Sequence, residues 1–166
     1  MYTAYLAAVA LHILAAMLWV GGMLFLVLVV LPAVRHPELQ PHRQRIIEQT
    51  GIFFRRAGWI ALGVLIVTGT FNVLYRWTSW DAVVDGSFWQ TPAGALLGWK
   101  LVLFLAMLAV HAVHDFWLGP RAMDATLPSQ LLRAQTVRRA ASWVGRVVLL
   151  LSIVIVVLAV LFVRGC

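Results

Sequence analysis

The chain contains apolar runs that are too long and too free of charge for the interior of a soluble domain of this size. Residues 13–34 read ILAAMLWVGGMLFLVLVVLPAV and include no Asp, Glu, Lys or Arg. A bilayer core of ~30 Å needs about 20 such residues in a helix. Hydrophobic residues make up 63% of the 166 residues and charged residues 11%. This pattern predicts an integral membrane protein.

Four apolar segments use most of the chain and leave no room for a separate soluble domain. They run roughly over residues 5–34, 57–75, 92–118 and 141–163. Because the bilayer forces each backbone polar group to be satisfied within its own segment, each segment should be a helix. We therefore expect one all-α domain over residues 1–166 that forms a four-helix bundle in contact with the lipid bilayer. Whether this domain assembles as a homo-oligomer is left open by the sequence.

Lys and Arg are distributed unevenly between the connections. The second connection contains only Arg76 and the tail only Arg164, whereas the other two connections are rich in arginine: Arg35, Arg43, Arg45, Arg55 and Arg56 in the first, and Arg121, Arg133, Arg138 and Arg139 in the third. Cytoplasmic loops carry the excess of positive charge. Both termini should therefore lie on the outer (periplasmic) side of a prokaryotic inner membrane. The net charge of +7 is explained by topology, so no nucleic-acid partner is expected.

Several polar side chains fall inside the expected spans, where an ionisable residue indicates function unless it is paired or wetted. At 100° per residue, Lys100, His111 and His114 share one face of the third span. Faces of this kind line the interior of a bundle, where cofactors and metals are held. The predicted cofactor-binding residues are His12, Trp19, Asn72, Arg76, Lys100 and His111. Thr68 is not among them, although it lies on the same helix face as Asn72.

Distance along the helices separates these residues into two levels. Taking the flanking arginines as the cytoplasmic floor, His12 and Lys100 lie about 30–35 Å above it, and His111 only ~15 Å above it. His12 and His111 should therefore not clamp one metal ion. The outer level contains His12, Asn72, Lys100 and Arg76, and the inner level His111, His114 and Asp115, with Arg121 near. We expect His114 and Asp115 to form a solvated pair.

The outer level suits a tetrapyrrole. Haem needs an axial ligand, an apolar slot and cations for its propionates. His12 could ligate the iron, and Lys100 and Arg76 could pair with propionates. The leading hypothesis is therefore haem b or a related iron-porphyrin, and the alternative is copper. The candidate metal ligands are His12, His111 and, less favoured, His114. A third interpretation is a structural subunit in which His12 and Asn72 only hydrogen-bond between helices.

Three segments together resemble the copper resistance protein D (CopD) family: LHILAAMLWVGGMLFLVLVVLPAVR, RRAGWIALGVLIVTGTFNVLYRW and GWKLVLFLAMLAVHAVHDFWLGPR. The matching features are His12, the Trp19–Gly21–Gly22 run, the Gly69 and Asn72 pair, and Lys100 at the start of the third span. This resemblance implies a membrane protein that binds or transports copper.

His12, Lys100 and His111 are also similar to residues of the HemJ-type protoporphyrinogen oxidases, which are four-helix membrane proteins that bind haem b. That resemblance implies an iron cofactor and a redox role in electron transfer or porphyrin handling, with a quinone, porphyrin or redox protein as partner. His111 would then be a second ligand or a relay for protons or electrons. A haem-dependent oxidoreductase activity, HemJ-like or quinone-linked, is an expectation left open.

Overall fold

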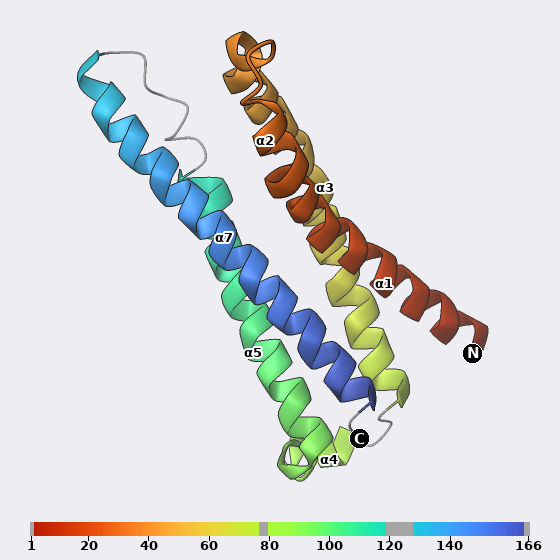
Figure 1. The fold of residues 1–166 in the computed structure, drawn as a ribbon. Coiled ribbons are helices and arrows are strands. Elements are labelled where there is room, and N and C mark those ends of the chain that lie inside the picture. The colour runs from red at the N-terminus through yellow and green to blue at the C-terminus, as the bar shows by residue number, and fades with distance from the viewer. Residues whose placement is uncertain (1, 77–79, 119–127, 165–166) are drawn as a thin grey trace. The chain divides into compact units, whose positions relative to one another are not determined.

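The computed structural model describes residues 2–76, 80–118 and 128–164, which are almost entirely helical and include no strand (Figure 1). The all-α fold class is therefore confirmed. Within these residues, four helical segments are long and apolar enough to cross a membrane: Tyr2–Ala33, Gln40–Tyr75, Pro92–Trp117 and Arg139–Leu161. The chain divides into two compact units, Met1–Trp80 and Asp81–Cys166. The single four-helix bundle and the orientation of the termini remain predictions.

The first unit is a pair of long helices that lie side by side (Figure 1). Its elements are α1 (Tyr2–Phe25), the π-helix η1 (Leu26–Val30), α2 (Leu31–Ala33), the 3-10 helix η2 (Gln40–His42) and α3 (Arg43–Arg76).

A proline explains where the first helix loses its regular geometry. The Leu31 N–H donates to the Leu26 carbonyl oxygen, five residues back, which defines a widened turn. Pro32 follows directly, and proline lacks an N–H and clashes with the carbonyl four residues earlier. The first span therefore ends as a π-helix and a short α-turn, close to the expected end at residue 34.

Aromatic rings and glycines fix the register between α1 and α3. The rings of Tyr5 and Tyr75 stack with centroids 4.5 Å apart. Further along α1, the buried Trp19 lies against Gly58, where a Cβ would stand 2.7 Å from Trp19 Cζ3. Trp19 also stacks on Phe54 with centroids 5.9 Å apart. As the contacts advance along α1 they recede along α3, so the two helices are antiparallel and closely packed.

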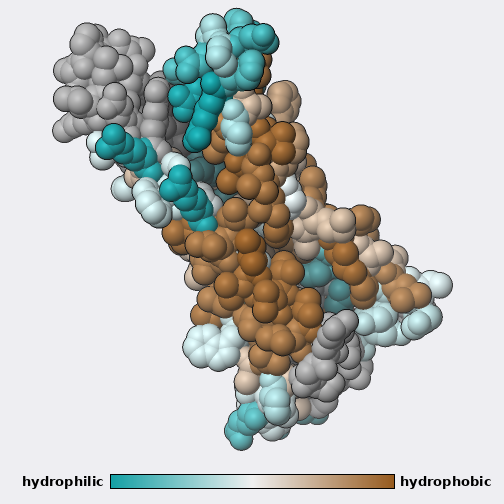
Figure 2. Space-filling view, in the orientation of Figure 1, coloured by the Kyte–Doolittle hydropathy of each residue, from teal (hydrophilic) through white to brown (hydrophobic). Residues whose placement is uncertain are grey.

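The helix α3 begins well before the second expected span, at Arg43 and not near residue 57. Within its polar first part, the Thr50 hydroxyl donates to the Ile46 carbonyl oxygen (2.6 Å). The expected bound marks the edge of the apolar region, and the helix extends past it through the polar residues that precede this region. Figure 2 shows hydrophobic side chains along the middle of α1 and α3 and hydrophilic ones where α2 leads into α3.

The second unit pairs α5 (Pro92–Val113) with α7 (Pro128–Arg164), and α5 continues as the π-helix η4 (His114–Leu118). Two short helices, α4 (Trp80–Val84) and the 3-10 helix η3 (Phe88–Gln90), precede α5.

The helix α5 is positioned by a cap at its start and by one buried contact with α7. Thr91 caps its start by accepting a hydrogen bond from the Gly94 N–H at 3.0 Å, and Pro92 occupies the first turn. Towards the other end, the buried Ser152 of α7 donates to the Val148 carbonyl oxygen at 2.8 Å and lies 3.3 Å from the Met107 sulfur of α5. This contact sets the register of α5 against α7.

Candidate functional site

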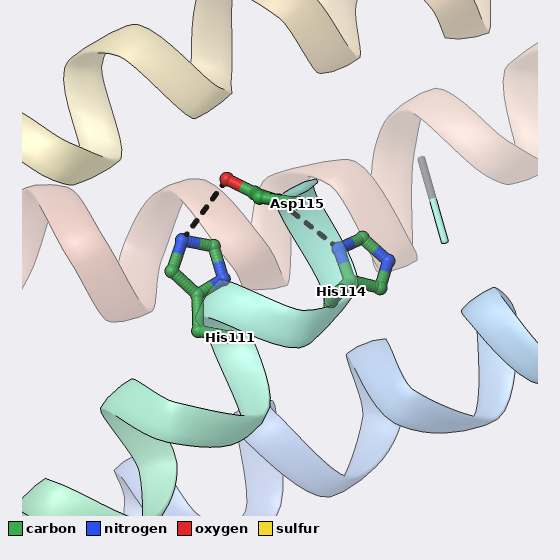
Figure 3. Close-up of polar contacts among 3 residues, drawn as sticks. All are labelled: His111, His114 and Asp115. Atoms are coloured by element: carbon green, nitrogen blue, oxygen red, sulfur yellow. Dashed lines mark hydrogen bonds and ion pairs between the residues drawn. The ribbon is translucent and has the colours of Figure 1, made fainter. Parts of the chain in front are cut away.

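Two imidazoles and a carboxylate converge where α5 passes into η4. Asp115 Oδ2 lies 3.3 Å from His111 Nε2, and Asp115 Oδ1 lies 3.1 Å from His114 Nδ1. Figure 3 shows the Asp115 carboxylate linked by a dashed line to each of the two rings. The ring centroids are 6.4 Å apart and the ring planes differ by only 13°.

The cluster is local in sequence, and helix geometry accounts for it. His111 precedes His114 by three residues and Asp115 by four, and side chains at these spacings are neighbours on a helix surface. The π-helix begins at His114, inside the cluster. Single π-turns within α-helices occur frequently at functional sites. The backbone irregularity and the polar cluster therefore coincide.

Burial distinguishes this cluster from an ordinary surface group of charges. Asp115 is 7% exposed and His111 6% exposed, whereas the His114 side chain is 30% exposed. The expectation of a solvated His114–Asp115 pair was therefore wrong for Asp115, because its carboxylate is buried. An isolated carboxylate in such a place is strongly unfavourable unless it is paired or bound to a metal.

The donor atoms fit a metal ion. One ligand atom from each of His111, His114 and Asp115 can be chosen so that all lie within 4.8 Å of one another. Ligand atoms around one ion bound at about 2.0–2.1 Å stand roughly 3–4 Å apart, so small side-chain rotations would complete a site. Imidazole and carboxylate donors suit copper(II) and zinc, and divalent copper binds such sites more tightly than zinc.

A second histidine is held between the helices of the first unit. His12 Nδ1 lies 2.8 Å from the hydroxyl oxygen of the buried Thr68. The ring of His12 also rests over Gly69, where a Cβ would stand 3.2 Å from its Cε1. Thr68 was absent from the predicted cofactor-binding residues. Thr68 lies on the same helix face as Asn72, and this spacing could have identified it from the sequence.

The remaining predicted cofactor-binding residues differ in their surroundings. Lys100 is half-buried and lies eleven residues before His111 on α5, roughly 16 Å along the helix, so the two do not share a site. Trp19 serves packing against Gly58. Asn72 is half-buried, and within the described part of the chain its Oδ1 has no hydrogen-bond partner. The side chains of Arg76 and Arg121 lie outside the described residues.

The four helices of membrane-spanning length fit a multi-pass membrane protein, and the buried histidine–carboxylate cluster is a candidate metal site. Residues 48–162 match the family described as copper resistance protein D, CopD, and the chain belongs to this family. A protein of Aquifex aeolicus (strain VF5), described as uncharacterized, is 32% identical over 152 residues, which cover 90% of this chain and 89% of that protein. No solved structure matches the chain.

These matches bear directly on the expectations from the sequence. The resemblance to the CopD family is confirmed. The family description names copper, which favours our alternative over the leading haem hypothesis. The similarity to HemJ-type oxidases stays an expectation.

Proposed function

We propose that this protein binds copper within the membrane, at the cluster of His111, His114 and Asp115. The observation that carries the proposal is the convergence of two imidazoles and one buried carboxylate within 4.8 Å. The CopD family match supports copper as the metal. The protein would bind or transport copper in a prokaryotic inner membrane, which is the location that the distribution of arginines predicts.

Each residue of the cluster has a distinct part in binding. His111 and His114 supply nitrogen donors, and Asp115 supplies an anionic oxygen. A bound divalent copper ion would supply positive charge beside a carboxylate that is otherwise costly to bury. The half-exposed His114 marks the side from which an ion would reach the cluster, since His111 and Asp115 are covered.

The test is the metal content of the purified protein. Copper and iron are measured per chain after expression with added copper, for the unmodified protein and for a His111→Gln/His114→Gln double variant. The matched control is His36→Gln/His42→Gln, because both of these histidines are exposed in the connection between α2 and α3. About one copper per chain that is lost only in the first variant supports the proposal. Equal copper in all three proteins would overturn it.

A second candidate function, haem binding at His12, is favoured by one specific observation. The Nδ1 of His12 is held by Thr68 at 2.8 Å, and histidines that ligate metals generally have their other ring nitrogen fixed in this way. The test is the absorption spectrum of the purified protein. A Soret band that disappears in His12→Gln supports haem, and copper without porphyrin rejects it.

A further inference from the structure

The hydroxyl group of Thr68 has two hydrogen-bonding neighbours but only one proton to share between them. Its oxygen lies 2.6 Å from the Val64 carbonyl oxygen and 2.8 Å from His12 Nδ1. A carbonyl oxygen can only accept a hydrogen bond. The Thr68 proton is therefore donated to Val64, and the Thr68 oxygen accepts a proton from the imidazole.

This arrangement determines the tautomer of His12. A neutral imidazole has one N–H and one nitrogen with a lone pair. Because Nδ1 carries the proton that is donated to Thr68, the lone pair is on Nε2. The opposite tautomer would place the Nδ1 lone pair against the Thr68 oxygen, and one of the two short contacts would lose its hydrogen bond. Neutral imidazole with a lone pair is the form that ligates metals.

The surroundings keep the ring in this orientation. Thr68 is 7% exposed, so water has little access to its hydroxyl. A Cβ at Gly69 would stand 3.2 Å from Cε1 and 3.7 Å from Nδ1 of His12, so the ring lies directly on this glycine. Thr68 and Gly69 are adjacent on α3. The hydrogen bond and the glycine surface therefore fix the same edge of the imidazole.

We propose that Thr68 is a positioning residue that holds His12 as the Nδ1–H tautomer and so places on Nε2 the lone pair through which an imidazole binds a metal. The proposal goes beyond copper binding at His111, His114 and Asp115. It rests on the haem candidate only for the identity of what Nε2 binds, and the tautomer is measurable with no ligand added.

Nitrogen-15 NMR of the histidine-labelled protein in detergent tests the tautomer directly. The spectra are taken at about pH 8, above the ordinary imidazole pKa of about 6.5, and the His12 signals are those lost in His12→Gln. The unmodified protein should show the proton on Nδ1. Observation of the proton on Nε2 would overturn the proposal, and this measurement needs no Thr68 variant to fold.

Two Thr68 variants separate positioning from a merely structural role. Thr68→Val keeps the shape but removes the hydroxyl, and should give a mixture of tautomers. Thr68→Ser keeps the hydroxyl and should retain the Nδ1–H form. A Thr68→Val protein with an unchanged tautomer would contradict the proposal.

Titration with haem adds an independent result. If haem binds at His12, Thr68→Val should weaken its binding by about 10–100-fold, as expected for loss of a partner that orients a metal ligand, while Thr68→Ser stays close to the unmodified protein. Equal haem affinity in Thr68→Val would count against the positioning role. An unmodified protein that shows the Nδ1–H tautomer but binds no haem rejects the haem candidate and leaves the assignment of Thr68 intact.

Discussion

Asp115 lies one helical turn after His111, and its Oδ2 stands 3.3 Å from the His111 Nε2. Both side chains are almost fully covered, in a segment apolar enough to cross a membrane. A buried carboxylate between imidazoles can be satisfied by protons or by a metal cation, and the family match favours copper.

Replacing Asp115 tests the contribution of the carboxylate. Asp115→Asn keeps the shape but removes the negative charge and one anionic donor, so copper affinity should fall by at least about 10–100-fold. The measurement is competition with a chromophoric copper chelator. Asp81→Asn is the matched control, because Asp81 is exposed in the first turn of α4. Equal losses in the two variants would show that the effect is not specific to the cluster.

Two glycines of α3 differ in what surrounds them and give a paired test of the α1–α3 packing. A Cβ at Gly58 would lie 2.7 Å from Trp19 Cζ3, whereas a Cβ at Gly63 would meet nothing within 4 Å. Gly58→Ala should lower the free energy of unfolding by about 1–3 kcal/mol, as overpacking does. Gly63→Ala should raise it by about 0.5–1 kcal/mol, because alanine favours a helix interior more than glycine does. Unfolding in mixed detergent micelles measures both, and equal effects would refute this packing.

Two glycines near the start of α5 give a second paired test of packing. The Cβ of an alanine at position 94 would collide with the Phe88 carbonyl group, including a contact of 2.7 Å to its carbon, and these are backbone atoms that cannot rotate away. At Gly98 the nearest atom is a Trp89 ring carbon at 3.6 Å, an ordinary contact. Gly94→Ala should cost about 3 kcal/mol or more, whereas Gly98→Ala should raise the stability by about 0.5–1 kcal/mol, as alanine does in a helix interior. A well-folded, equally stable Gly94→Ala protein would contradict this arrangement.

The turn before η3 should respond to acid. The Ser87 N–H donates to Asp85 Oδ1 at 2.8 Å, and this bond lowers the pKa of Asp85 from its ordinary value of 3.8. A lowered carboxyl pKa means that the bond stabilises the turn above the ordinary value and is lost as the pH falls through the lowered one. The Ser87 amide resonance should titrate below 3.8. Asp85→Asn should abolish that titration. A midpoint above 3.8 in the unmodified protein would contradict this prediction.

Hydropathy and helical spacing predicted the features that depend on one segment at a time. They located four spans and placed His111 and His114 on one face. The burial of Asp115 depends on packing beyond its own helix, and the pairing of His12 with Thr68 depends on the register between α1 and α3. Neither relation can be obtained from periodicity within a single helix.

The most direct test of the central proposal is X-ray absorption at the copper edge of the purified protein. The account predicts a copper site with light-atom donors and the multiple scattering of two imidazoles. That signal should fall to one imidazole in His111→Gln and stay at two in His36→Gln. Copper bound only by sulfur, or a protein that carries iron porphyrin and no copper, would contradict it.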